Sequence, residues 1–166
     1  MSGQPTSHVL QRVQDLLAAR KVPFELSSHR PVFTSAQAAE VRGEPLHSGA
    51  KALIVKAEAS FVMLVIPGDH QLDNKAAKQL LHAKNVRFAT REEVMQISGL
   101  QPGSIPPFGS LFGLTTWCDE SLGENERINF NAGSHTQSIC MTYRDYLAAE
   151  QPHVGAFSRP AGTAKG

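Results

Sequence analysis

A lysine inside a strongly apolar segment is the first residue whose type and position suggest chemistry. Lys51 stands in Gly49-Ala50-Lys51-Ala52-Leu53-Ile54-Val55-Lys56, a run typical of a buried strand. An ammonium group is costly to bury there unless it binds something or reaches solvent. Strand alternation places Lys51 and Lys56 on opposite faces. If the face of Lys51 borders a cleft, its charge can bind an anionic or carbonyl-bearing ligand; alternatively, either lysine extends from a strand end to solvent.

A glycine- and proline-rich segment, residues 101–113, is the second candidate. Its three prolines and three glycines exclude a regular helix. Backbone amides displayed by such a loop can form an oxyanion hole, although a purely structural turn is the alternative. The residues of this loop that we expect at the site are Gly103, Ser104, Ile105, Pro107, Phe108 and Gly109. The loop lacks the Gly-Lys-Ser/Thr ending of a phosphate-binding loop, and Gly-x-Ser-x-Gly is absent, so neither nucleotide hydrolysis nor a serine hydrolase is indicated.

A polar break at residues 131–136 is the third candidate, because it offers amide, hydroxyl and imidazole groups between two apolar segments. His135 could act as a base or orient a ligand there, although a histidine in a turn is often a solvated surface residue. The seven histidines include no H-x-H or H-x-x-x-H pair, and Cys118 and Cys140 form no C-x-x-C motif. We therefore expect no metal and no other cofactor, and two reduced thiols.

Apolar periodicity and capping signals predict the elements that position these residues. We expect helices at about residues 8–20, 34–43, 75–82, 90–99 and 143–150, and strands at about 22–26, 50–57, 60–67, 86–89, 114–118, 127–131 and 137–141. Capping boxes begin at Thr34 and Thr90, and the two longest strands form a central hairpin. The predicted organisation is one domain over residues 1–158, followed by a poorly ordered tail at 159–166.

The charge is unevenly distributed along the chain, although the formal net charge is only +1. Residues 51–91 carry seven lysines and arginines against three acids, a balance of +4, whereas residues 92–150 have a balance of −6. One face could therefore favour a polyanion, or both could be ordinary solvated faces. The longest apolar run, at residues 61–67, is too short to cross a bilayer, and no signal-peptide core is present near the N-terminus. We expect a cytoplasmic protein with no membrane partner.

Taken in order, several short motifs resemble the YbaK/ProX family of aminoacyl-tRNA deacylases, which includes the editing domain of bacterial prolyl-tRNA synthetases. The resemblance spans about residues 22–149, and its motifs are Gly49-Ala50-Lys51-Ala52-Leu53, Val65-Ile66-Pro67-Gly68-Asp69, the G-x-x-x-P loop Gly103-Ser104-Ile105-Pro106-Pro107, Asp119-Glu120-Ser121-Leu122 and Phe130-Asn131-Ala132-Gly133. It implies an α/β (α+β mixed) fold in which a curved mixed sheet forms a partly closed barrel with flanking helices. By position, Lys51, Gly103 and Pro107 resemble the family's functional residues, and the substrate pocket is expected to include His29, Asn131, Gly133, Ser134, His135 and Ser138.

The same resemblance implies an activity. It predicts a free-standing enzyme that hydrolyses the ester of tRNA mischarged with a small amino acid such as Ala, Ser or Cys, without a metal and with help from the terminal ribose hydroxyl. The partners would be the acceptor end of aminoacyl-tRNA and, in one version, an aminoacyl-tRNA synthetase. A non-catalytic accessory protein of the same fold that binds tRNA or a synthetase is the first alternative. A hydrolase or binding protein for a free metabolite is the second.

Overall fold

The predicted hairpin of two apolar strands is the centre of the structure. Strands β2 (Ala50–Ala57) and β3 (Ser60–Pro67) pair antiparallel along their whole length in the computed structural model, which describes residues 5–161. One face of the pair contributes Ile54 and Met63 to the larger hydrophobic cluster. The opposite face contributes Val55 and Leu64 to a second cluster. Both faces are covered, and this explains why the two strands are apolar runs rather than alternating patterns.

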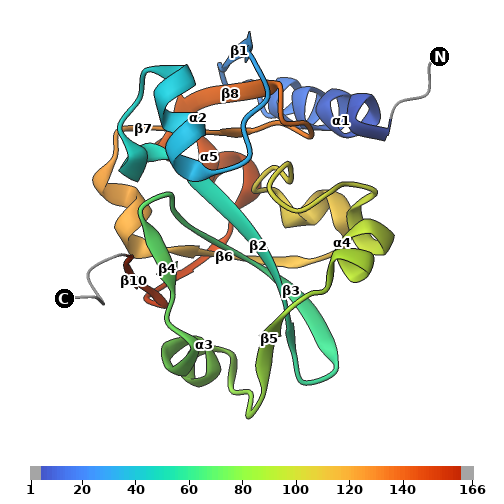
Figure 1. Cartoon of the computed structure of the whole chain (residues 1–166), viewed down its shortest axis with the longest axis vertical. Helices are drawn as coiled ribbons and strands as arrows, with labels where there is room; N and C mark the ends of the chain where they lie inside the picture. The colour runs from blue at the N-terminus through green and yellow to red at the C-terminus, as the bar shows by residue number, and fades with distance from the viewer. Residues whose placement is uncertain (1–4, 162–166) are drawn as a thin grey trace.

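The described strands form three sheets around this hairpin (Figure 1). In the five-stranded sheet, of order β5-β2-β3-β6-β9, the hairpin is flanked by β5 (Val86–Phe88), β6 (Thr115–Asp119) and β9 (His153–Gly155). A three-stranded antiparallel sheet has the order β1 (Glu25–Ser28), β8 (Gln137–Thr142), β7 (Arg127–Asn131), and β10 (Ser158–Pro160) pairs with β4 (His70–Leu72). The mixed α/β class is confirmed. No closed barrel is formed by the described strands, although a single bridge between Gly49 and Asn129 joins the edges of the two larger sheets.

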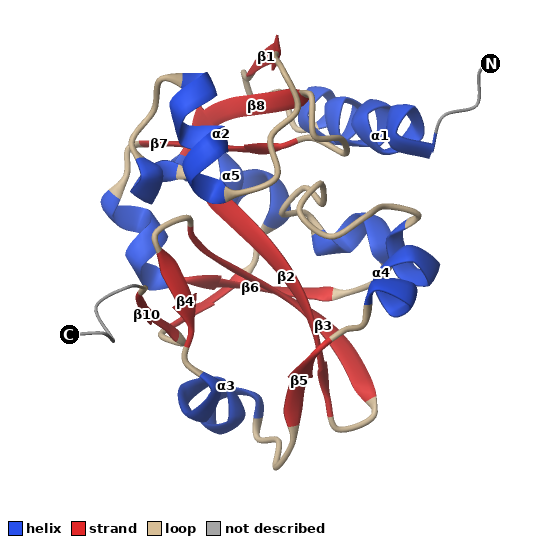
Figure 2. Cartoon of the chain, in the orientation of Figure 1, coloured by secondary structure: helices blue, strands red, loops and turns tan. Residues whose placement is uncertain are grey.

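Helices surround the sheets on several sides (Figure 2). They are α1 (Pro5–Ala19), α2 (Ser35–Arg42), α3 (Asn74–Leu81), α4 (Arg91–Ser98) and α5 (Tyr143–Glu150), with 3₁₀ turns η1 (Leu46–Ser48), η2 (Gly109–Phe112) and η3 (Glu120–Glu124). Helices α1 and α2 lie beside the three-stranded sheet, whereas α3 and β5 lie at the opposite end of the molecule (Figure 1). None of the helices in the described part of the chain has the length and apolar character needed to span a membrane.

The predicted capping signals form real caps. Thr34 accepts a hydrogen bond from the Gln37 amide at 3.0 Å, and α2 ends at Gly43 in the left-handed conformation that glycine favours. In the box at Thr90, the Glu93 carboxylate accepts a hydrogen bond from the Thr90 amide. The box at Thr34 differs, because the Gln37 side chain accepts from the Phe33 amide instead. Helix α2 is therefore held in place at both ends.

Two predicted boundaries are wrong. The first strand begins at Glu25 rather than residue 22, because Val22 and Phe24 pack against the larger cluster before pairing starts. The poorly ordered tail does not begin at Arg159, which pairs with Gln71 of β4. Its composition suggests disorder, but the exposed edge of β4 offers backbone partners that override this preference. The rest of the predicted tail, residues 162–166, lies outside the described residues.

The ion pair at the start of α4 generates a prediction on stability. Arg87 donates hydrogen bonds of 2.8 and 3.0 Å to the Glu93 carboxylate, and these bonds, with those from Thr90, lower the pKa of Glu93 to about 2. A depressed carboxyl pKa stabilises the fold above the unfolded-state pKa, and the contribution is lost as the pH falls from about 4.5 to about 2. We expect Glu93→Gln to lower Tm at pH 7, with the difference from wild type shrinking towards pH 2.

Thermal unfolding followed by circular dichroism at pH 7, 4 and 2 measures this difference. Glu92→Gln, in the same helical turn, is the matched control. A Tm difference that stays constant over this pH range would contradict the assignment.

Candidate active site

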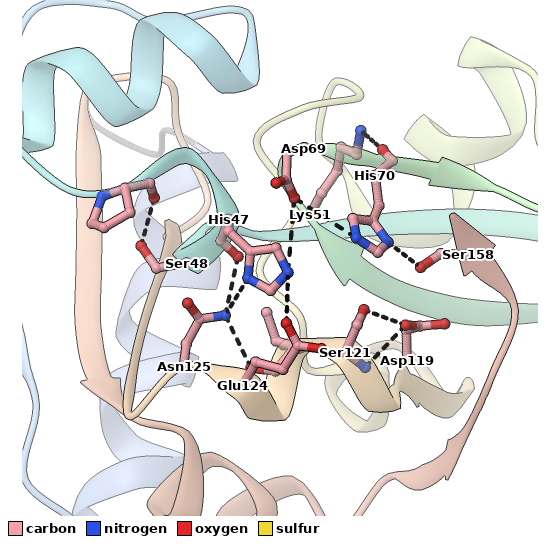
Figure 3. A network of polar contacts seen from close by, with 12 residues as sticks. His47, Ser48, Lys51, Asp69, His70, Asp119, Ser121, Glu124, Asn125 and Ser158 are labelled. Carbon is pink, nitrogen blue, oxygen red and sulfur yellow. Dashed lines mark hydrogen bonds and ion pairs between the residues drawn. The ribbon is translucent and has the colours of Figure 1, made fainter. Parts of the chain in front are cut away.

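Lys51 lies at the start of β2 and borders a cavity of about 120 Å³, here called the Lys51 cavity. Its Nζ donates a hydrogen bond of 3.0 Å to the His70 carbonyl (Figure 3). Burial lowers the pKa of Lys51 below its ordinary value, and the Asp69 carboxylate opposes this shift. Lys51 thus lines the cavity, and its ammonium is partly buried and bonded to the His70 carbonyl. The remaining cavity residues come from the α2 region, the β2 and β3 ends and the glycine-rich loop, and they are Phe33, Thr34, Ser35, Ala38, Ala39, Arg42, Leu46, Gly49, Ala50, Ala52, Gly68, Gly103, Ile105 and Asn131.

Gly68 allows two segments at the rim of the Lys51 cavity to lie close together. It follows β3, and a Cβ atom at this position would lie only 2.6 Å from the Leu46 carbonyl oxygen of η1. Any larger residue would therefore push the β3–β4 turn away from η1. The glycine allows the two segments to approach on either side of Lys51.

The glycine-rich loop presents backbone groups to the Lys51 cavity. Gly103 has φ +92°, a conformation that favours glycine, and its carbonyl accepts a 2.6 Å hydrogen bond from Asn131 Nδ2. The Ser104 amide donates to the Gln101 carbonyl within the turn. The amides of Gly103 and Ile105 have no acceptor among the described residues, so they are available to a ligand. A free amide pair at a small cavity is what an oxyanion site requires.

The other predicted residues of this loop lie in the interior instead of lining the Lys51 cavity. The Pro107 carbonyl accepts a 2.7 Å hydrogen bond from the Tyr146 hydroxyl, and the Phe108 ring packs edge-on against Phe130 and Tyr146. The Gly109 amide donates to Thr116 Oγ1 at 2.9 Å. These three residues anchor the loop to β6, β7 and α5, and the buried Ser104 belongs with them because its hydroxyl donates to Gln101.

The predicted residues of the opposite wall divide between two places. Asn131 borders the Lys51 cavity, and His135 supports its rim, since its ring lies 4.7 Å from Phe33 and its Nδ1 lies 3.0 Å from the Val32 carbonyl. Gly133, with φ +94°, donates to the Ser104 carbonyl, and Ser134 contacts Thr136 locally.

His29 and Ser138 lie elsewhere. His29 Nε2 is 2.7 Å from Ser138 Oγ, and both border a second cavity of about 220 Å³, here called the Ser138 cavity. The predicted site is thus only partly brought together at the Lys51 cavity.

Arg42 is the residue at this site that sequence reasoning missed. It occupies the last turn of α2, where an arginine has the ordinary interpretation of a cation at a helix C-terminus. In the structure its guanidinium turns inward and donates to Asn129 Oδ1, Asn131 Oδ1 and Ser138 Oγ at 2.6, 2.9 and 2.9 Å. Burial lowers the pKa of Arg42 to about 10, so the group remains cationic at neutral pH. No local sequence pattern predicts this, because all three acceptors lie far away in the chain.

A second group that the sequence did not reveal lies beside Lys51 (Figure 3). His47, Asp69 and His70 place their ligand atoms within 4.8 Å of one another, a spacing that could hold a metal ion. Asp69 Oδ1 is buried without a hydrogen-bond partner and lies 4.0 and 3.9 Å from the Nε2 atoms of His47 and His70. However, the Asn125 amide nitrogen lies 2.9 Å from His47 Nδ1, which places the imidazole proton on Nε2. The carboxylate nearest to His47 Nε2 is that of Glu124, at 3.6 Å. The group is therefore a cluster of two imidazoles and two carboxylates beside Lys51.

Comparisons with known proteins show the family of this chain. The model of the aminoacyl-tRNA editing domain matches residues 29–149. The multifunctional Ser/Thr-tRNA deacylase ProXp-y of Escherichia coli K12 is 31% identical over 156 residues, which cover 91% of this chain and 93% of that protein. The proline–tRNA ligase of Bacillus subtilis is 34% identical over 97 residues, covering 57% of this chain and 17% of the ligase.

Solved structures show the same fold. A hypothetical protein, APE2540, superposes with a TM-score of 0.82 at 26% identity over 89% of this chain and 99% of its own. A candidate trans-editing enzyme for prolyl-tRNA synthetase gives a TM-score of 0.82 at 24% identity over 95% of this chain and 99% of its own. The family model and the relative matched over nearly its whole length place this chain in the class of tRNA-editing hydrolases. The chain belongs to the aminoacyl-tRNA editing-domain family, as an enzyme of the deacylase class.

The anchoring of the glycine-rich loop generates the second prediction. Tyr146 is fully buried, and Tyr146→Phe removes the hydroxyl that the Pro107 carbonyl accepts from. A buried carbonyl without a partner costs about 1–3 kcal/mol. We expect the free energy of unfolding, measured by urea titration, to fall by about that amount. Tyr143→Phe on the same helix, where the ring is only half-buried, is the control and should cost less. An equal loss in both variants would show that the loop does not depend on Tyr146.

Proposed function

We propose that this chain hydrolyses the ester bond between a small amino acid and the terminal ribose of a tRNA. The observation that carries the proposal is the Lys51 cavity of about 120 Å³. Its lining includes Lys51, whose ammonium is partly buried, and Gly103 and Ile105, whose amides have no acceptor among the described residues. Family membership supports it, and so does the similarity over nearly the whole chain to an E. coli Ser/Thr-tRNA deacylase. Serine and threonine are therefore the first amino acids to test, followed by alanine and cysteine.

The chemistry needs neither a side-chain nucleophile nor a metal, because an aminoacyl ester is already activated. Water attacks the carbonyl carbon and gives up a proton to the vicinal ribose hydroxyl. That hydroxyl passes its own proton to the leaving ribose oxygen as the ester bond breaks. The protein contributes orientation and charge. In the proposed arrangement, the amides of Gly103 and Ile105 receive the developing oxyanion, and Lys51 binds polar groups of the terminal adenosine or of the substrate.

Selection among amino acids would operate by size. A small cavity accepts a small side chain and excludes a bulky cognate residue, which is the logic of a second sieve. The tRNA would be held by its acceptor end, and the basic residues between 51 and 91 are candidates for backbone contacts. Among them Lys75 and Lys78 are exposed on α3.

The third prediction tests Lys51 directly. We expect Lys51→Ala to slow deacylation of mischarged tRNA by about 10- to 100-fold, because this is the effect on rate of losing one charge-assisted hydrogen bond. The measurement is release of labelled amino acid from one tRNA body charged in turn with Ser, Thr, Ala or Cys. Lys56→Ala is the matched control, because Lys56 lies on the same strand but outside the cavity, above the Phe61 ring.

The possible outcomes separate the assignments. Equal rates for wild type and Lys51→Ala would remove Lys51 from the mechanism. Wild-type rates no faster than spontaneous hydrolysis on every charged tRNA would refute the proposed activity. In that case, retention of the charged tRNA in a filter-binding assay would favour the accessory-protein alternative.

A further inference from the structure

Arg42 stands between two cavities. It borders both the Lys51 cavity and the Ser138 cavity, which is larger at about 220 Å³, and no other described residue borders both. Beyond Arg42, the Ser138 cavity is lined by polar groups that include those of His29, Glu44 and Ser138. The arginine side chain therefore decides how deep the Lys51 cavity is.

The guanidinium is fixed by its neighbours. Its three hydrogen bonds go to side chains on β7 and β8, and two of the acceptors are themselves held in place. Asn131 donates to the Gly103 carbonyl at 2.6 Å, and Asn129 donates to Ser48 Oγ at 2.9 Å. A long side chain held at three points in this way behaves as a rigid wall and not as a movable gate.

The wall is also polar and cationic. Of the five N–H groups of a guanidinium, three have acceptors here, so two remain without one among the described residues. No carboxylate of the described chain lies within 4.0 Å of Arg42. The Glu44 carboxylate is near enough to raise the pKa of Arg42 but forms no ion pair with it, so the positive charge is only partly offset. This charge disfavours the α-ammonium of an aminoacyl ester, and we expect the amino acid to direct its side chain, and not its amino group, towards Arg42. An oxygen acceptor on that side chain would satisfy an N–H group that a methyl group would leave unpaired.

We propose that Arg42 is the specificity-determining residue of the aminoacyl pocket, excluding long side chains by its bulk and favouring a hydroxyl over a methyl group by its free N–H donors. This inference rests on the proposed deacylase function of the Lys51 cavity. It predicts two properties that substitution can separate, because bulk and donors need not be removed together.

The first experiment needs no variant. One tRNA body is charged with Thr or with Val, which have the same shape and differ by a hydroxyl in place of a methyl group. Wild type is expected to deacylate the Thr ester at least about tenfold faster, since a site built to hydrogen-bond a hydroxyl discriminates strongly against its absence. Equal rates, or faster release of Val, would overturn the proposal.

Two substitutions then separate bulk from hydrogen bonding. Arg42→Met keeps a long side chain without donors, so the Thr/Val rate ratio should fall towards one while Met and Leu esters stay excluded. Arg42→Ala should join the two cavities and raise the rate of deacylation of Met and Leu esters by about tenfold or more. This is the rate difference expected when a pocket gains room for one or two methylene groups. Arg127→Ala, which changes an exposed arginine on β7 outside both cavities, is the control.

The failures are distinguishable. Wild type that is inactive on every ester refutes the proposed function, and this inference with it. Active wild type with Arg42 variants that slow all esters equally would show that Arg42 only supports the fold. Circular dichroism tests whether each variant is folded at the assay temperature. If a variant is unfolded, Arg42→Lys replaces it, because lysine keeps the charge and the length but lacks the planar set of N–H donors. It should reduce the Thr/Val ratio and keep Met and Leu excluded; an unchanged ratio would contradict the proposal.

Discussion

A buried guanidinium needs hydrogen-bond acceptors, and three of the five N–H groups of Arg42 donate to neutral oxygens on the three-stranded sheet. These bonds tie α2 to β7 and β8. The bridge between Gly49 and Asn129 then brings the start of β2 to the same place, and a Cβ at Gly49 would come within 3.7 Å of the guanidinium. The position of Lys51, two residues further along, therefore depends on this network. The cavity exists because one cation organises the helix, the three-stranded sheet and the first residues of the central hairpin around itself.

Two cations thus border one small space, and each is supported differently. Lys51 has the Asp69 carboxylate nearby, which opposes the lowering of its pKa by burial. Arg42 donates hydrogen bonds only to neutral acceptors, and the Glu44 carboxylate opposes the lowering of its pKa without forming an ion pair. A ligand group entering between them is favoured if it presents oxygen and disfavoured if it presents an ammonium. An ester carbonyl and a ribose hydroxyl meet this condition, and the α-amino group of the same substrate must point elsewhere. The electrostatics of the cavity therefore constrain the orientation of the substrate as well as its size.

Much of the fold could be predicted from apolar runs and capping residues, because these signals depend only on residues that are close together in the sequence. The hairpin of β2 and β3 followed from two apolar runs, and the helix ends at Gly43 and Gly99 followed from capping residues. The site was predicted where a residue looks unusual in its own segment, as Lys51 does. Arg42 looks ordinary at a helix C-terminus, and its role arises only from contacts across the fold. The approach of His47 to His70 and the pairing of β10 with β4 are likewise set by tertiary structure, which no spacing rule reports.

Some residues of the glycine-rich loop border the cavity, and others hold the loop in place. Amides left without acceptors are destabilising, so a loop that presents them needs anchors elsewhere. Gly103 and Ile105 border the cavity, whereas Pro107, Phe108 and Gly109 are buried against α5 and β6. The proline of the G-x-x-x-P pattern thus contributes a carbonyl to Tyr146 instead of a contact to the cavity. Its spacing from the glycine sets how far the free amides stand from that anchor.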